Sequence, residues 1–144
     1  MGRPKREAKM GFGQAVSSGL RNFFTFAGRA PRSEYWFFYL FFIICAFAGG
    51  FLDGLLGLAV FNEDDEFVYG PLLVLSILLL FFPQLSVAVR RLHDIGRSGW
   101  WLWLGLIPFV GGLILLVWAC MRGTEGNNKY GPNPLHPVPV GVFD

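Results

Sequence analysis

Three long apolar runs, separated by short polar segments, dominate the pattern of the chain. They cover residues 35–58, 67–89 and 100–121, and Asp53 is the only charged residue inside them. A helix of about 20 residues crosses a hydrocarbon core about 30 Å thick, and in lipid the backbone must satisfy its own hydrogen bonds. The pattern therefore predicts an all-α integral membrane protein with three transmembrane helices.

The segment before the first run has a helical period of its own. Between residues 11 and 27, apolar side chains recur at three- and four-residue steps, namely Phe12, Val16, Leu20, Phe23 and Phe24. This spacing predicts a short amphipathic helix in the cytoplasmic headgroup plane. The basic residues 1–10 are predicted to be disordered and residues 135–144 to form a flexible tail, which leaves residues 11–134 as a single membrane domain.

Glycine and proline mark irregular positions within the predicted helices. Gly50 and Gly54 form a small-xxx-small pair, a spacing that allows another helix to approach closely. Pro83 predicts a kink in the second helix, because proline removes one backbone hydrogen bond. Pro108, followed by Gly111, predicts that the third helix is bent or locally unwound near mid-bilayer.

The charges between the runs are sorted by sign. Residues 1–34 carry seven basic and two acidic side chains, residues 90–97 carry three arginines and one acid, and residues 63–66 are all acidic. Because short basic loops stay in the cytoplasm, the N-terminus and the second loop should lie inside and the acidic loop outside. Three crossings would then place the C-terminus outside. A fourth, re-entrant element, or a tail that packs against the arginines, would place it inside.

Asp53 is the one acid in an apolar run, and an ionisable residue at depth suggests a functional role. It is the nineteenth residue of the first run, which puts it near the outer interface, where it can reach water. We interpret it as an interfacial residue, with a functional role as the alternative.

The densest polar clusters flank the cytoplasmic ends of the predicted helices. The candidate interaction residues are Arg29, Arg32, Glu34, Arg90, Arg91, His93, Asp94 and Arg97. One interpretation is a snorkelling, self-paired basic cap that fixes topology. The other is an anionic headgroup site, in which guanidinium groups supply forked donors and His93 a titratable proton. The cap is favoured, since topology already demands basic residues there.

The sequence offers little for catalysis. His93 and Asp94 are adjacent, so on a helix their side chains diverge by about 100° and form no ready dyad. HExxH, GxSxG and metal-ligand spacings do not occur in the sequence. We expect no enzymatic activity, no metal or other cofactor, and no nucleic-acid partner.

Three sequence blocks resemble a known family. The chain contains, in order, FAGRAPRSEYWFF, then RRLHDIGRSGWW followed by LIPFVGG, then GTEGNNKYGPNP. This arrangement is similar to that of the YhaH-like bacterial inner-membrane proteins called domain of unknown function 805. The match covers about residues 24–134, with departures at Pro31, Lys129 and Asn133. The resemblance implies a small multi-pass protein of the bacterial inner (plasma) membrane with three or four helical segments, and it implies no known activity.

Three classes of function follow from these features. The favoured class is interaction, through helix packing, anionic lipid headgroups, a second copy of the chain or another membrane protein. The alternative is a subunit of an oligomeric small transporter or channel, although the apolar runs hold few polar residues. A membrane enzyme acting on lipid headgroups is the third class, and the sequence carries no motif for it.

Overall fold

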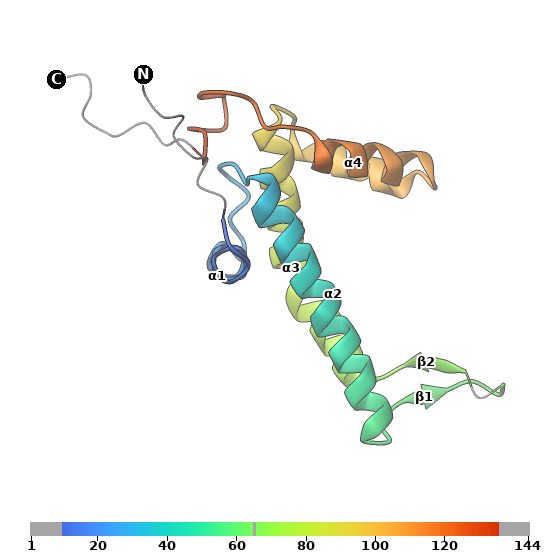
Figure 1. The fold of residues 1–144 in the computed structure, drawn as a ribbon. Coiled ribbons are helices and arrows are strands. Elements are labelled where there is room, and N and C mark those ends of the chain that lie inside the picture. The colour runs from blue at the N-terminus through green and yellow to red at the C-terminus, as the bar shows by residue number, and fades with distance from the viewer. Residues whose placement is uncertain (1–9, 65, 136–144) are drawn as a thin grey trace.

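The computed structural model describes residues 10–64 and 66–135. In chain order the elements are helix α1 (Phe12–Arg21), helix α2 (Arg32–Leu55), strand β1 (Val60–Phe61), strand β2 (Phe67–Tyr69), helix α3 (Pro71–Asp94), the 3₁₀ helix η1 (Gly99–Leu106) and helix α4 (Val110–Cys120). The predictions for residues 1–9 and 136–144 fall outside the described residues. Figure 1 shows α2 and α3 as a long pair, with the β1–β2 hairpin at one end and α1 and α4 at the other.

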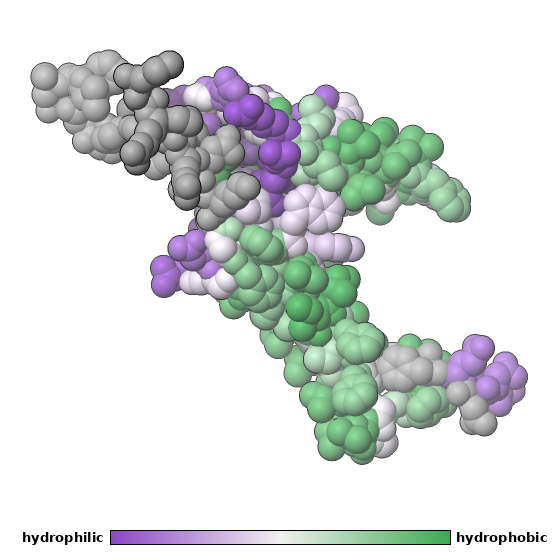
Figure 2. Space-filling view, in the orientation of Figure 1, coloured by the Kyte–Doolittle hydropathy of each residue, from purple (hydrophilic) through white to green (hydrophobic). Residues whose placement is uncertain are grey.

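Within the described residues, α2 and α3 are the two helices long and apolar enough to cross a membrane. Each has 24 residues, which corresponds to about 36 Å of helix. Figure 2 shows hydrophobic side chains along this pair and polar residues concentrated toward its two ends. This distribution suits helices whose sides face lipid and whose ends face water.

Both helices are displaced toward the end that carries α1, relative to the sequence-based bounds. The first helix covers Arg32–Leu55 rather than 35–58, and the second covers Pro71–Asp94 rather than 67–89. At the α1 end the helices continue through charged residues, which find partners inside the protein. At the opposite end an antiparallel hairpin, with Val60 opposite Tyr69, takes up residues that were expected to be helical.

The expected third transmembrane helix over residues 100–121 is not confirmed, because these residues form two shorter helices. The chain turns between them at Pro108 and Phe109, and Phe109 has a positive φ of 62°. A Cβ atom at Gly111 would collide with the carbonyl oxygen of Leu104, so η1 and α4 approach closely at this point. The third apolar run therefore doubles back as a helical hairpin. Pro108 and Gly111 mark the break, as the sequence indicated, but the break reverses the chain.

Asp53 is a buried cap for α3 rather than an interfacial residue in contact with water. Its side chain is 0% exposed. Its Oδ1 accepts a hydrogen bond from the backbone N–H of Leu72 at 3.0 Å, and its Oδ2 accepts one from Leu73 at 2.8 Å. These are N–H groups of the first turn of α3, which have no partner within their own helix. Gly70 makes room for the carboxylate, since a Cβ there would collide with it.

The close approach between α2 and α3 uses a different glycine from the predicted pair. A Cβ atom at Gly49 would lie 2.8 Å from the backbone oxygen of Leu72. Gly54 is exposed, and a Cβ there would meet nothing within 4 Å among the described residues. Gly54 therefore does not pack against α3. A role for Gly50 and Gly54 in association with another chain stays a prediction.

Helix α1 lies across the start of α2. It appears almost end-on in Figure 1, whereas α2 and α3 run obliquely through the view. A Cβ at Gly19 would collide with the ring of Phe38, which is fully buried, and Phe12 packs edge-on against Phe37 at 6.0 Å between ring centroids. The helix predicted here is present over Phe12–Arg21. Its placement in the headgroup plane stays a prediction.

Candidate functional site

Five charged side chains are buried together at the end of the α2–α3 pair that carries α1. This ion-pair cluster consists of Arg29, Glu34, Arg90, Arg91 and Asp94. Each of these residues is at most 7% exposed. Arg29 precedes α2, Glu34 lies in its first turn, and the other three occupy the last turn of α3. The cluster therefore forms at the start of α2 and the end of α3.

Asp94 stands at the centre of the cluster. Arg29 donates from Nε to its Oδ1 at 2.9 Å, and Arg91 donates from Nη1 to its Oδ2 at 2.5 Å. Hydrogen bonds between ionised groups are shorter and stronger than neutral ones. Both carboxylate oxygens are thus occupied by guanidinium groups from two different parts of the chain.

Glu34 and Arg90 form the second pair. Arg90 Nη2 lies 2.9 Å from Glu34 Oε1, and the hydroxyl of Ser18 donates to the same oxygen at 2.8 Å. Arg90 also accepts, through its backbone oxygen, a hydrogen bond from the N–H of Ala30 at 3.0 Å. This pair connects α1, α2 and α3 at one point.

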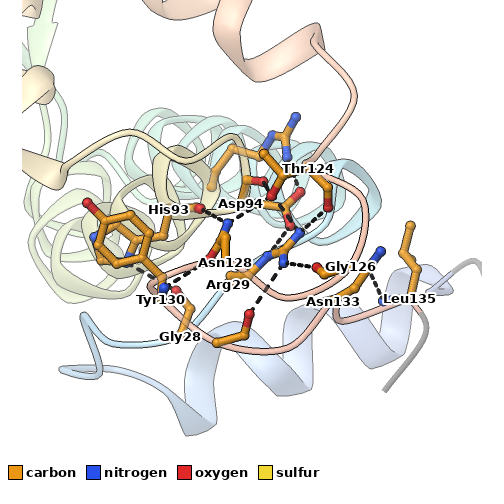
Figure 3. Close-up of polar contacts among 12 residues, drawn as sticks. Gly28, Arg29, His93, Asp94, Thr124, Gly126, Asn128, Tyr130, Asn133 and Leu135 are labelled. Atoms are coloured by element: carbon orange, nitrogen blue, oxygen red, sulfur yellow. Dashed lines mark hydrogen bonds and ion pairs between the residues drawn. The ribbon is translucent and has the colours of Figure 1, made fainter. Parts of the chain in front are cut away.

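The segment after α4 supplies the remaining acceptors. Arg29 donates to the backbone oxygens of Gly126 at 2.7 Å and Thr124 at 2.6 Å, and Arg91 donates to that of Met121. The N–H of Thr124 in turn donates to the backbone oxygen of Asp94 at 2.8 Å. Figure 3 shows this segment wrapped around the Arg29 side chain.

The position of this segment corrects the expected location of the C-terminal part of the chain. Three straight crossings would carry residues 121–131 to the end opposite Arg29. Their contacts with Arg29 and Arg91 instead hold them at the same end as α1 and the last turn of α3. The physical reason is the hairpin of η1 and α4, which returns the chain to the end from which it left. The sequence allowed a tail that packs against the arginines, and the structure contains such a tail.

His93 is held beside the cluster by the same segment. Its ring is stacked on that of Tyr130, with centroids 3.8 Å apart and planes within 4° of parallel. Its Nδ1 lies 3.1 Å from the backbone oxygen of Gly28, and Asn128 donates to its backbone oxygen at 2.9 Å. Tyr130 and Asn128 therefore fasten the tail over the end of α3, whose last carbonyl groups have no partner within the helix.

Arg32 and Arg97 lie at the rim rather than in the cluster. Arg32 is exposed and donates to the backbone oxygen of Cys120 at 3.3 Å. The guanidinium carbon of Arg97 lies 4.0 Å from the ring centroid of Trp118 and 6.0 Å from that of Trp101. The structure thus brings together six of the eight predicted residues and leaves two accessible.

The self-pairing of the first sequence-based interpretation is present in the cluster, but the snorkelling is not. A snorkelling cap would leave the arginines in water, and a headgroup site would leave their donors open. Instead, Arg29 and Arg91 donate hydrogen bonds to Asp94 and to backbone oxygens of the tail. The arrangement fastens three segments of the chain to each other. Each of the two carboxylates is engaged by at least one arginine.

Several residues of the site were not among the eight candidate interaction residues. Ser18 lies in the short first helix, and the tail contributes Thr124, Asn128 and Tyr130. The block GTEGNNKYGPNP was recognised as resembling a family pattern, and that block contains the three tail residues. No local pattern in the chain marks Ser18, whose role depends on the crossing of α1 and α2.

Comparison with known proteins agrees with the resemblance. The family model described as "Protein of unknown function (DUF805)" matches residues 23–132. The chain is 45% identical to "Inner membrane protein YhaH" of Escherichia coli (strain K12) over 115 residues, which cover 80% of this chain and 91% of that protein. It is 44% identical to "Inner membrane protein YhaI" of the same strain over 117 residues, 81% of this chain and 92% of that protein.

A third relative is more distant. The chain is 31% identical to "Uncharacterized protein YiiR" of Escherichia coli (strain K12) over 133 residues, which cover 75% of this chain and 84% of that protein. No solved structure matches the chain. The family match spans both halves of the ion-pair cluster and the tail that covers it. The chain therefore belongs to the DUF805 family of proteins of unknown function, and it is an inner-membrane protein.

Proposed function

We propose that this inner-membrane protein acts by interaction rather than by catalysis, through a rigid cap that it presents at the cytoplasmic face. The cap consists of the ion-pair cluster, residues 27–34 and residues 121–131. Its partners are another membrane protein, a second copy of the chain, or anionic lipid. The observation that carries the proposal is the burial of all five cluster side chains with partners inside the chain. Prior ordering of a binding surface lowers the entropy lost on association.

The proposed topology has two crossings, by α2 and α3. Positive charge around Arg29 and Arg97 supports a cytoplasmic location for the cap and the N-terminus, because short basic segments stay inside. The acidic turn of the β1–β2 hairpin, at the opposite end of the pair, then faces the periplasm. The hairpin of η1 and α4 would enter the cytoplasmic leaflet without crossing it. Its large apolar side chains support this placement, since Phe109 at its tip is 94% exposed.

Helix α1 would lie on the cytoplasmic surface beside the cap. Phe12 and Leu20 are each 41% exposed on this helix, while Ser18 reaches the cluster. Apolar side chains of an interfacial helix enter the boundary between headgroups and acyl chains. The helix would thus hold the cap at a fixed depth.

A site-specific photo-crosslinker tests the interaction. We would place it at Asn127, which is exposed on the cap, and as a matched control at Asp64, which is exposed on the hairpin turn. Irradiation of intact membranes should give a discrete adduct, either a dimer or one heterologous partner, from position 127 and none from position 64. Identical adduct patterns from both positions, or none from position 127, would argue against a protein partner for the cap.

A further inference from the structure

An apolar groove of about 820 Å³ lies in the corner between α3 and η1. One wall is a stripe of α3 residues spaced one helical turn apart, Phe81, Leu85 and Val89, with His93 at its end. The other wall is η1, which contributes Trp103 and other apolar side chains. None of the residues that line the groove is acidic or carries a permanent charge.

The shape of this groove matches one leaflet of a bilayer. From Phe81 to His93 the stripe rises by about 18 Å along the helix. One leaflet contributes about half of a hydrocarbon core about 30 Å thick. An apolar hollow at this depth is filled by hydrocarbon, because water entering it would lose hydrogen bonds. An acyl chain is the hydrocarbon that the membrane supplies.

Two cations neighbour the residues at the polar end of the groove, although neither cation lines it. Ser98 and His93 line it there, and Arg97, next to Ser98 in the chain, is held against Trp118 at 4.0 Å. Lys129 Nζ lies 4.9 Å from the ring centroid of Tyr130, which stacks on His93. The ion pairs among the described residues do not include Arg97 or Lys129. Two cations thus stand near the mouth of an apolar groove, where a phosphate group would complement their charge.

We propose that this groove binds one acyl chain of an anionic phospholipid, whose phosphate lies between Arg97 and Lys129. The ion-pair cluster is excluded as the headgroup site because its arginines are buried and paired with carboxylates of the same chain. The aromatic wall of η1 agrees with this depth, since tryptophan concentrates at the membrane interface. The inference rests on the proposed function in one respect, which is the placement of the hairpin in the cytoplasmic leaflet.

Lipid retention measures the charge part of the proposal. The full chain would be purified in mild detergent, equilibrated with equal amounts of phosphatidylglycerol and phosphatidylcholine, and examined by native mass spectrometry. The wild type should retain one phosphatidylglycerol in preference to phosphatidylcholine. Arg97→Gln should lower that retention by about fivefold, the effect of one basic residue near an anionic lipid surface. Arg21→Gln removes an exposed arginine of α1, away from the groove, and should leave retention unchanged.

Filling the groove measures the apolar part. Leu85→Trp places a large ring in the groove and should displace the lipid. Leu78→Trp, at a position on α3 that is 62% exposed and does not line the groove, is the matched control and should retain it. If Leu85→Trp fails to fold, the comparison of Arg97→Gln with Arg21→Gln still tests the lipid site. Equal retention of the two lipids by the wild type, or full retention by Arg97→Gln, overturns the proposal, as does retention by a folded Leu85→Trp.

This experiment and the crosslinking experiment fail independently. A protein that retains phosphatidylglycerol in the groove but gives no adduct at position 127 would support the lipid site and refute the protein-binding cap. A discrete adduct without lipid selectivity would refute the lipid site alone.

Discussion

Replacing Asp94 with alanine is the sharpest perturbation of the ion-pair cluster. The change removes the counter-ion shared by Arg29 and Arg91, whose nitrogen atoms lie 2.9 and 2.5 Å from its oxygens. The three side chains are between 1% and 5% exposed, so water does not replace the carboxylate without rearrangement. Because arginine stays protonated in proteins, two charged groups would remain buried without their partner.

The magnitude follows from that burial. Removing one partner of a buried ion pair costs about 3–5 kcal/mol. Both arginines keep backbone acceptors in the tail, which holds the expected loss within that range although two pairs are broken. The matched control is Glu125→Ala, which removes a pair 3.4 Å apart whose side chains are 67% and 81% exposed. An exposed pair of this kind contributes about 0–1 kcal/mol.

The assay combines thermal unfolding in mild detergent with limited trypsin digestion. Asp94→Ala should lower the unfolding temperature and speed cleavage at Lys129. The Asp94 carboxylate holds the Arg29 side chain in place, and Arg29 in turn binds the backbone of the tail. Glu125→Ala should resemble the wild type in unfolding temperature and in cleavage at Lys129. If Asp94→Ala unfolds at the wild-type temperature and its tail is equally protected, the reasoning that this carboxylate fastens the tail is refuted.

Two further substitutions test the other contacts that shape the fold. Asp53→Ala should destabilise the protein by about 0.5–2 kcal/mol, the range for a lost helix cap. The control Glu63→Ala, on the exposed turn, should leave the stability unchanged. Equal unfolding temperatures for the two variants would contradict the capping role. Gly111→Ala should destabilise the hairpin by forcing its two helices apart, whereas Gly112→Ala meets open space and should be neutral or stabilising. Comparable unfolding curves for both alanine variants would show that the hairpin is not closely packed.

The sequence predicted the two long helices well because the residues within each apolar run are enough to determine a helix. A run of apolar residues the length of a bilayer has few alternatives to a helix. The same reasoning located the basic and acidic ends of the pair. It also identified the residues of the cluster, since arginines and acids next to an apolar run have few other roles. It did not show which charges pair, because Arg29 and Asp94 are 65 positions apart.

The local pattern of the third apolar run does not determine whether the chain crosses the membrane or reverses. Proline is tolerated in transmembrane helices, so Pro108 is equally consistent with a kinked crossing and with a reversal. The outcome depends on tertiary contacts, namely the close approach of Gly111 to Leu104 across the turn and the hydrogen bond from Arg29 to the distant tail. Asp53 is a similar case. Its partners Leu72 and Leu73 belong to the next helix, so the first apolar run by itself does not show that Asp53 is a buried cap.

The central claim is that the cap, including the tail, lies on the cytoplasmic side after two crossings. It is tested most directly by labelling single cysteines at positions 127 and 64 with a membrane-impermeant thiol reagent, after replacement of the native Cys45 and Cys120. In intact cells with a permeabilised outer membrane, Asp64→Cys should be labelled and Asn127→Cys should be protected, and inverted vesicles should give the reverse. Labelling of both positions from the periplasmic side would contradict the account, because the tail would then lie across the membrane from the arginines that it is said to cover.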